Sequence, residues 1–166
     1  AQDEDPASLA KASLVSEVKV AKPGSTIWVA LRFEMAPHWH LGWAVPGDNG
    51  LPTTVEWEVP PGVMMGELHF PVPSRFEYEG FVLYVHEGTF HLLAPVSIPA
   101  DWEVGEPVEL KAKLSSSVCN DTTCKLLDQS FSLTLATGNA VVFDDRQKPD
   151  FDKARLSLPQ PLPDSI

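Results

Sequence analysis

Short segments in which apolar and polar residues alternate are the dominant pattern of this chain. In residues 27–35 every second residue is large and apolar, so one face of the segment is fully apolar. A period of two residues is that of a β-strand with one face buried in a core. Similar segments predict further strands at residues 14–20, 54–59, 66–70, 81–86, 90–96, 108–114 and 130–135.

Turn-forming residues separate these segments at short intervals. The chain contains 16 prolines, and residues 45–53 and 60–62 are rich in Pro and Gly. About seven to nine short strands with this spacing are typical of an all-β domain built as a two-sheet sandwich. Residues 71–80 are expected to form a loop between strands, and this loop carries Phe76 and Tyr78.

The alternating pattern stops near both ends of the chain. Residues 1–11 are acidic at their start and are expected to be a flexible N-terminus, so the sandwich is expected to cover residues 12–137. Residues 138–166 are expected to be a C-terminal extension or linker, which would lead to a further domain in a longer chain. Within it we expect a short helix at residues 151–158 and an extended, proline-rich stretch at residues 158–163.

Cys119 and Cys124 are the only two cysteines, and they lie between two alternating segments. Four residues that favour tight turns separate them, which predicts a β-hairpin with one cysteine at each strand end. Directly opposed residues on antiparallel strands have Cα atoms about 4.5–5.5 Å apart, and a disulfide needs about 4.4–6.8 Å. The spacing therefore favours a disulfide at the tip of the hairpin.

This spacing alone leaves two interpretations of the disulfide open. It can be an ordinary structural bond, although closing so small a loop contributes only about 2 kcal/mol. Alternatively, it can be a bond that another thiolate reaches and exchanges, because an exposed tip gives the necessary access. The C-x4-C spacing differs from the C-x-x-C of thioredoxin-like motifs, and two cysteines alone make a poor zinc site.

Composition and charge narrow the classes of function. The chain has 166 residues, of which 43% are hydrophobic and 21% charged, and its net charge is -11. This acidity argues against binding to nucleic acid or to anionic membrane surfaces. The five histidines are scattered over the predicted strands, which is more typical of packing or surface residues than of a metal site, so no metal or cofactor is predicted. The acidic start is compatible with the mature end of an exported protein.

Several short motifs accompany the cysteine pair in a fixed order. They are Trp39-His40-Leu41, residues 46–53, Trp57, Arg75-Phe76, Gly80, Tyr84, Glu87-Gly88 and Val118-Cys119 with Cys124. In this ordered set, over residues 12–137, the chain resembles the N-terminal region of DsbD-type and ScsB-type thiol:disulfide interchange proteins. It departs from that pattern at Gly42, where a Tyr is frequent, and at Lys125-Leu126-Leu127, where a Pro usually follows the second cysteine.

The resemblance implies an immunoglobulin-like sandwich whose Cys119/Cys124 pair is redox-active. It implies that a transmembrane reductase domain, in the same or another chain, reduces the pair. The pair would then pass reducing equivalents to thioredoxin-like periplasmic proteins, which places this domain in the periplasm. A cap loop with an aromatic residue shields the pair in that family, and Phe76 is the first counterpart here, with Tyr78 second. The alternative is a non-redox β-sandwich for binding or assembly, with a structural hairpin disulfide.

The residues next to the cysteines in sequence predict little activation of a thiolate. Asp121 and Asp128 disfavour the charged sulfur, whereas Lys125 favours it. No helix start is expected near either cysteine. A weakly activated pair suits a carrier that reacts when a partner docks.

Overall fold

In the computed structural model of this protein, residues 5–47, 52–78, 80–120 and 122–159 are described. Within the strands, the side chains of residues 43–47, 76, 78, 81 and 83 lie outside this description. The elements are α1 (Pro6–Leu9), β1 (Ala10–Ser16), β2 (Val18–Ala21), β3 (Thr26–Met35), β4 (His40–Gly47), β5 (Thr54–Glu58), β6 (Met64–Met65), β7 (Ser74–Tyr78), β8 (Phe81–His86), β9 (Thr89–Ser97), β10 (Val108–Cys119), β11 (Cys124–Thr137), β12 (Val142–Phe143) and α2 (Lys148–Leu156).

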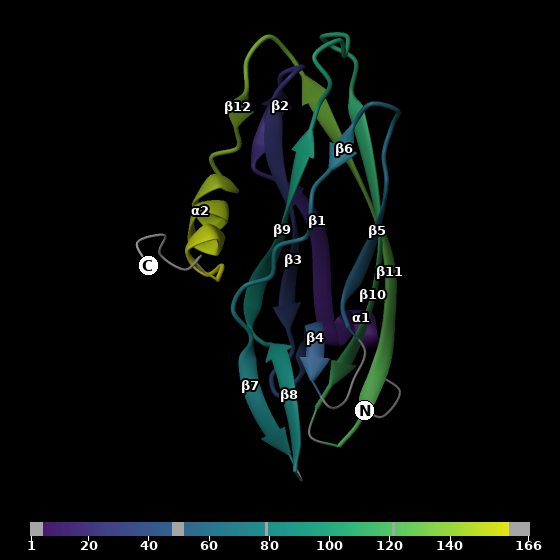
Figure 1. The fold of residues 1–166 in the computed structure, drawn as a ribbon, viewed down its shortest axis with the longest axis vertical. Coiled ribbons are helices and arrows are strands. Elements are labelled where there is room, and N and C mark those ends of the chain that lie inside the picture. Colours follow the sequence, from purple (N-terminus) through teal and green to yellow (C-terminus); the bar gives the residue numbers. More distant parts are fainter. Residues whose placement is uncertain (1–4, 48–51, 79, 121, 160–166) are drawn as a thin grey trace, which may run out of the picture.

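These strands form two layers, which confirms the predicted all-β sandwich. One sheet has the order β1-β3-β9-β6, and the other has the order β12-β2-β11-β10-β4-β8-β7, with β5 also pairing with β10. The layers form an elongated molecule in which the β10–β11 turn and the β7–β8 hairpin both lie at the lower end of the view (Figure 1). In the sheet order, only β4 separates the cysteine hairpin from the β7–β8 hairpin.

The space between the sheets is filled by two apolar clusters. The alternating residues of β3 contribute to both, with Ile27 and Val29 in one cluster and Leu31 and Phe33 in the other. The second cluster also contains Val118, which directly precedes the first cysteine. The strand that carries Cys119 is therefore anchored in the core up to the residue before the cysteine.

The observed strands differ from the expected ones in several places. Strands β4, β6 and β12 have no counterpart among the expected strands, and residues 45–47, expected in a turn-rich stretch, belong to β4. The segment at residues 14–20 is divided into β1 and β2, because the chain turns at Glu17. Residues 71–80 are expected as a loop but contain strand β7, whose residues pair with β8. At residues 66–70, where a strand is expected, the described structure has an isolated bridge between His69 and Leu93.

The described segments before β1 and after β11 pack onto the sandwich. Residues 6–9, expected in a flexible segment, form α1, and Leu9 is buried in the core. After β11 the chain adds β12 to the edge strand β2, and α2 then packs on the outer side of the four-stranded sheet (Figure 1). Phe151 of α2 is fully buried against Ala30 and Leu93.

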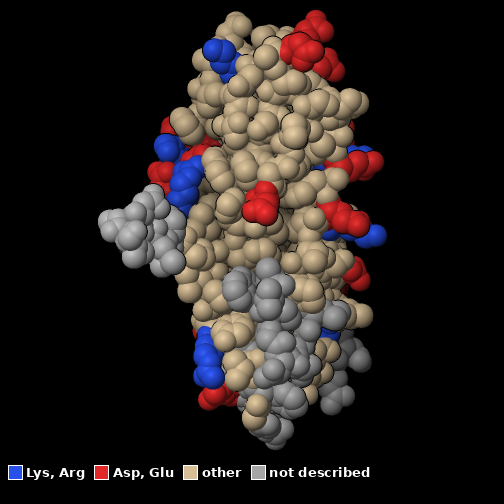
Figure 2. All heavy atoms as spheres, in the orientation of Figure 1, with Lys and Arg blue, Asp and Glu red and all other residues tan. Residues whose placement is uncertain are grey.

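Charged side chains lie mostly along the two long edges of the face shown in Figure 2, where basic and acidic groups are interspersed. The centre of that face carries few charges. Among the described residues, no helix combines the length and the apolar character needed to cross a bilayer.

Candidate functional site

The cysteine pair lies at the end of the longest strand pairing in the molecule. β10 and β11 are in continuous antiparallel register from Val108 opposite Leu135 to Cys119 opposite Cys124. The two cysteines are therefore the last pair before the turn, as the sequence predicts, and they form a disulfide with a Cα–Cα distance of 4.1 Å. The prediction of a hairpin disulfide at this position is confirmed.

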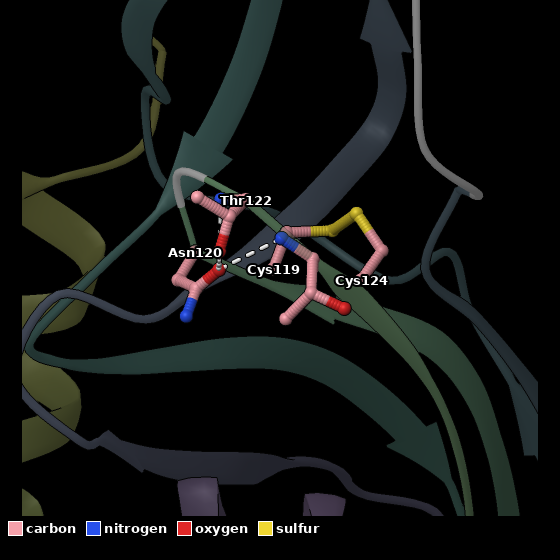
Figure 3. The surroundings of a disulfide bond; sticks show 5 residues. Cys119, Asn120, Thr122 and Cys124 are labelled. Atoms are coloured by element: carbon pink, nitrogen blue, oxygen red, sulfur yellow. Dashed lines mark hydrogen bonds between the residues drawn. A yellow bond between two sulfur atoms is a disulfide. The ribbon is translucent and has the colours of Figure 1, made fainter. Parts of the chain in front are cut away.

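The side chain of Asn120 organises the turn between the cysteines. Its Oδ1 accepts hydrogen bonds from the backbone N–H groups of Thr122 and Thr123, each at 2.9 Å (Figure 3). The backbone N–H of Asn120 donates to the carbonyl of Thr123, also at 2.9 Å. An Asn side chain that mimics a backbone turn in this way orders the turn by local contacts.

The two cysteines differ in their access to solvent. Cys119 is 8% exposed, whereas Cys124 and the two threonines before it are exposed. Leu126, two residues after Cys124 on the same strand, is also exposed. Because exchange begins when a thiolate reaches a disulfide sulfur, Cys124 presents the side of the bond that a partner can approach.

A buried histidine lies on the other side of Cys119. Cys119 of β10 pairs with Cys124 of β11 on one side and with His40 of β4 on the other. Directly opposed residues on antiparallel strands share a face of the sheet, with Cβ atoms about 4.5–5.5 Å apart. Cys124, Cys119 and His40 thus form a row across one face, and His40 is 5% exposed. The sequence places His40 in one of the motifs that accompany the cysteine pair, but it does not predict the position beside Cys119, because the pairing of β4 with β10 is a long-range contact.

His86 occupies a different environment, although its strand is the next neighbour of β4. It pairs with Leu41 and lies against the rings of Phe70 and Phe90, whose centroids are 6.0 and 5.0 Å away. Burial lowers the pKa of His86 to about 4, so its imidazole is neutral near pH 7. Among the described residues, no group of three or more His, Cys, Asp or Glu side chains is placed to hold a metal ion.

The two aromatic residues predicted to cap the disulfide lie on an edge strand rather than in a loop. Phe76 and Tyr78 belong to β7, where they pair with Leu83 and Phe81 of β8. Their side chains lie outside the described part of the structure, so the cap stays a prediction. The described neighbours Arg75 and Glu77 form a salt bridge of 2.8 Å.

The chain matches one family model and several solved structures. The family described as thiol:disulfide interchange protein DsbD, N-terminal, matches residues 7–136. The crystal structure of the N-terminal periplasmic domain of ScsB from Proteus mirabilis is 18% identical, with a TM-score of 0.61 over 88% of this chain and 53% of that one. This chain therefore spans about half of the ScsB structure, and the likeness concerns the fold, an immunoglobulin-like sandwich.

Two structures from Neisseria meningitidis are more distant in shape. The DsbD N-terminal domain in its reduced form is 23% identical, with a TM-score of 0.42 over 87% of this chain and 97% of that one. A complex between the DsbD and PilB N-terminal domains contains a chain that is 21% identical, with a TM-score of 0.34 over 69% of this chain and 80% of that one. No curated protein sequence matches this chain.

Proposed function

Because this chain belongs to the family of N-terminal domains of the thiol:disulfide interchange protein DsbD, we propose that it carries reducing equivalents through its Cys119–Cys124 pair. A transmembrane reductase domain, in the same or another chain, supplies them, and thioredoxin-like proteins of the periplasm receive them. The observation that carries this proposal is the disulfide at the hairpin tip, with Cys124 exposed and Cys119 buried. A partner's thiolate can attack such a disulfide at the sulfur of the exposed cysteine.

The exchange needs two steps in each direction. A thiolate of the reductant attacks the sulfur of Cys124, the Cys119–Cys124 bond breaks, and Cys119 leaves with the electron pair and takes up a proton. A second thiol of the reductant then attacks the reductant sulfur that is bonded to Cys124. This step releases Cys124 as a thiol and leaves the reductant with a disulfide. The same steps in reverse transfer two electrons and two protons to the disulfide of a thioredoxin-like acceptor.

The reduction potential of the pair tests this function. Structural disulfides have potentials below about -300 mV, whereas dedicated oxidoreductases lie above that value. Equilibrating the chain in a series of dithiothreitol or glutathione buffers, followed by thiol counting, is expected to give a potential above about -300 mV. A lower value would favour a binding or assembly domain with a structural disulfide.

Trapping of a partner tests the assignment of the two cysteines. Cys119→Ala leaves the exposed Cys124 able to attack a partner and removes the thiol that resolves the mixed disulfide. This variant is expected to accumulate a covalent complex with an oxidised thioredoxin-like protein, visible on a non-reducing gel. Cys124→Ala is the matched control and should accumulate much less, because Cys119 is buried. Equal yields from both variants would show that exposure does not select the attacking sulfur.

An aromatic cap over the disulfide completes the proposal. Phe76 is the first candidate and Tyr78 the second, because burying such a ring contributes about 1.5–3 kcal/mol and shields a reactive bond until a partner docks. Phe76→Ala is expected to speed reduction of the disulfide by dithiothreitol while leaving the circular dichroism spectrum unchanged. If Phe76→Ala is folded and reduced at the parent rate, Phe76 is not the cap, and Tyr78→Ala then tests the second candidate.

A further inference from the structure

The row formed by Cys124, Cys119 and His40 suggests a role for the histidine. Cys119 is flanked on its sheet face by Cys124 on β11 and by His40 on β4, through directly opposed backbone positions. Cys119 and His40 are both buried, whereas Cys124 is exposed. When the disulfide is reduced, Cys119 therefore becomes a thiol that solvent reaches poorly, with an imidazole beside it.

We propose that His40 accepts the proton of the Cys119 thiol when the domain passes its electrons on, and passes a proton from solvent to Cys119 when the domain is reduced again. The inference rests on the exchange function proposed above and assigns to His40 the proton step of that exchange. It addresses a physical difficulty, because a buried thiol becomes a nucleophile only after losing its proton, and burial disfavours the thiolate.

The proton and the electrons balance as follows. After Cys124 has formed a mixed disulfide with the acceptor, the Cys119 thiol gives its proton to the ring of His40. The Cys119 thiolate attacks the Cys124 sulfur, the Cys119–Cys124 bond forms, and the bond between Cys124 and the acceptor breaks. The acceptor's sulfur leaves with the electron pair and takes up a proton from solvent, and His40 then loses its extra proton to solvent.

The described titratable groups on the neighbouring strands do not offer a better acceptor. On β8 and just after it are Tyr84, which pairs with Arg75 of β7, His86, which faces the aromatic core beside Phe90, and Glu87, which is exposed. On β11 are Lys125, opposite Val118, and Asp128, whose Oδ1 accepts a hydrogen bond from Ser115 at 3.0 Å. His40 is the group among these that shares a directly opposed position with Cys119.

Ellman's reagent separates the two steps of the exchange. In the fully reduced chain, attack by Cys124 releases one thionitrobenzoate, and closure by Cys119 releases a second, so stopped-flow absorbance shows two phases. His40→Gln is expected to slow the second phase at pH 7 on the order of a hundredfold, in the range of general base catalysis. Its first phase should stay at the parent rate. The second phase of the variant should keep rising with pH after that of the parent has levelled off.

His38 provides the matched control. It lies two residues before His40, is exposed, and has a φ of 70°, a conformation that Asn tolerates well. His38→Asn is expected to leave both phases unchanged. A folded His40→Gln variant with a second phase at the parent rate and with the parent pH profile would overturn the proposal.

A second measurement tests the role of His40 even if His40→Gln does not fold. In Cys124→Ala, which keeps His40, the pH dependence of alkylation by iodoacetamide reports the thiolate of Cys119. An ordinary cysteine has its midpoint near about pH 8.5, and burial alone would move it higher. A midpoint below about 8.5 supports an imidazole partner, and a midpoint at or above that value overturns the proposal.

The two proposals fail in distinguishable ways. A reduction potential below about -300 mV, together with a second phase that His40→Gln slows, would remove the carrier function but leave the role of His40 at Cys119 intact. A potential in the oxidoreductase range with no effect of His40→Gln would leave the carrier function intact and remove the role of His40.

Discussion

The β10–β11 turn and helix α2 are both held in place by specific contacts. The contacts of the turn join residues close in sequence, whereas those of α2 join residues far apart in sequence. The turn is held by Asn120 and by a disulfide between residues only five positions apart. Helix α2 is held by residues distant in sequence. Phe151 is buried against two strands, and Arg155 binds Glu17 through two hydrogen bonds of 2.7 and 2.5 Å.

This difference separates reactivity from stability. Local contacts at an exposed tip order only a few residues, so breaking them changes the free energy of unfolding little. They nevertheless decide how the two sulfur atoms face each other. Long-range contacts such as those of Phe151 bury apolar area, so breaking them acts on stability and leaves the exposed tip as it was. The following experiments test this separation.

The largest effect on stability is expected in α2. Phe151→Ala should lower the free energy of unfolding by about 3–5 kcal/mol, because it empties a fully buried site. Leu156 on the same helix is 83% exposed, and Leu156→Ala should change stability by less than about 0.5 kcal/mol. Urea denaturation measures both. Dithiothreitol should reduce the disulfide of both variants at the parent rate, and faster reduction in Phe151→Ala would show that the two regions are coupled.

The next effect is the loss of stability at acidic pH, which we expect from His86 in the apolar core. The pKa of His86 is about 4 in the folded chain, and that of an exposed histidine is about 6.5. Between these values the unfolded chain binds more protons than the folded one, so the free energy of unfolding falls as pH is lowered from about 6.5 to 4, by at most about 3 kcal/mol. Burial also lowers the pKa of His91, which acts in the same direction.

Denaturation at pH 7 and near pH 4.5 tests this expectation. His86→Leu should lose less stability on acidification than the parent, because it removes the group that takes up the proton on unfolding. His38→Asn, at an exposed position, should keep the parent's pH dependence. If His86→Leu is as acid-sensitive as the parent, the acid sensitivity comes from other groups.

Reduction of the disulfide is expected to have a smaller effect. Opening so short a loop costs about 2 kcal/mol in the chain-entropy estimate. Urea denaturation with and without dithiothreitol should therefore show a cooperative, folded domain in both states. A loss well above about 4 kcal/mol would instead identify the disulfide as a structural support, since that exceeds what loop entropy supplies.

The sequence predicted the part of the site that depends on local pattern. Alternation on β10 and β11, with two cysteines at their facing ends, predicts the hairpin, its register and the disulfide. Strand β7 was missed because Pro71, Pro73 and Gly80 surround a short alternation and favour a loop. The prolines lie just outside the strand, where they cost no hydrogen bonds in the sheet.

Long-range contacts could not be predicted in the same way. The position of His40 opposite Cys119 depends on how β4 joins the sheet beside β10. The burial of Glu17 depends on Arg155, at the other end of the chain. A helix near residue 151 was expected, but its docking on Ala30 and Leu93 is a property of the assembled sandwich. Each of these is a tertiary contact for which a single sequence carries no local signal.

The smallest effect on stability, and the sharpest test of the comparison, is expected at Asn120. Asn120→Ala removes the acceptor of two backbone hydrogen bonds in the turn. Because both donors lie at an exposed tip, water replaces much of what is lost, and the free energy of unfolding should fall by about 1 kcal/mol or less. Asn120→Asp is the matched control, since its carboxylate can accept the same two bonds.

Asn120→Ala should change the equilibrium between the dithiol and the disulfide more clearly than it changes the free energy of unfolding. Without the Asn120 turn, the two thiols spend less time facing each other, so the disulfide forms less readily. A loss of about 1 kcal/mol in this preorganisation corresponds to a roughly fivefold shift of the equilibrium with dithiothreitol toward the dithiol. Asn120→Asp should stay close to the parent value. If Asn120→Ala shifts stability strongly and the disulfide equilibrium not at all, the turn belongs with α2 as a structural contact, and the separation between the two regions does not hold.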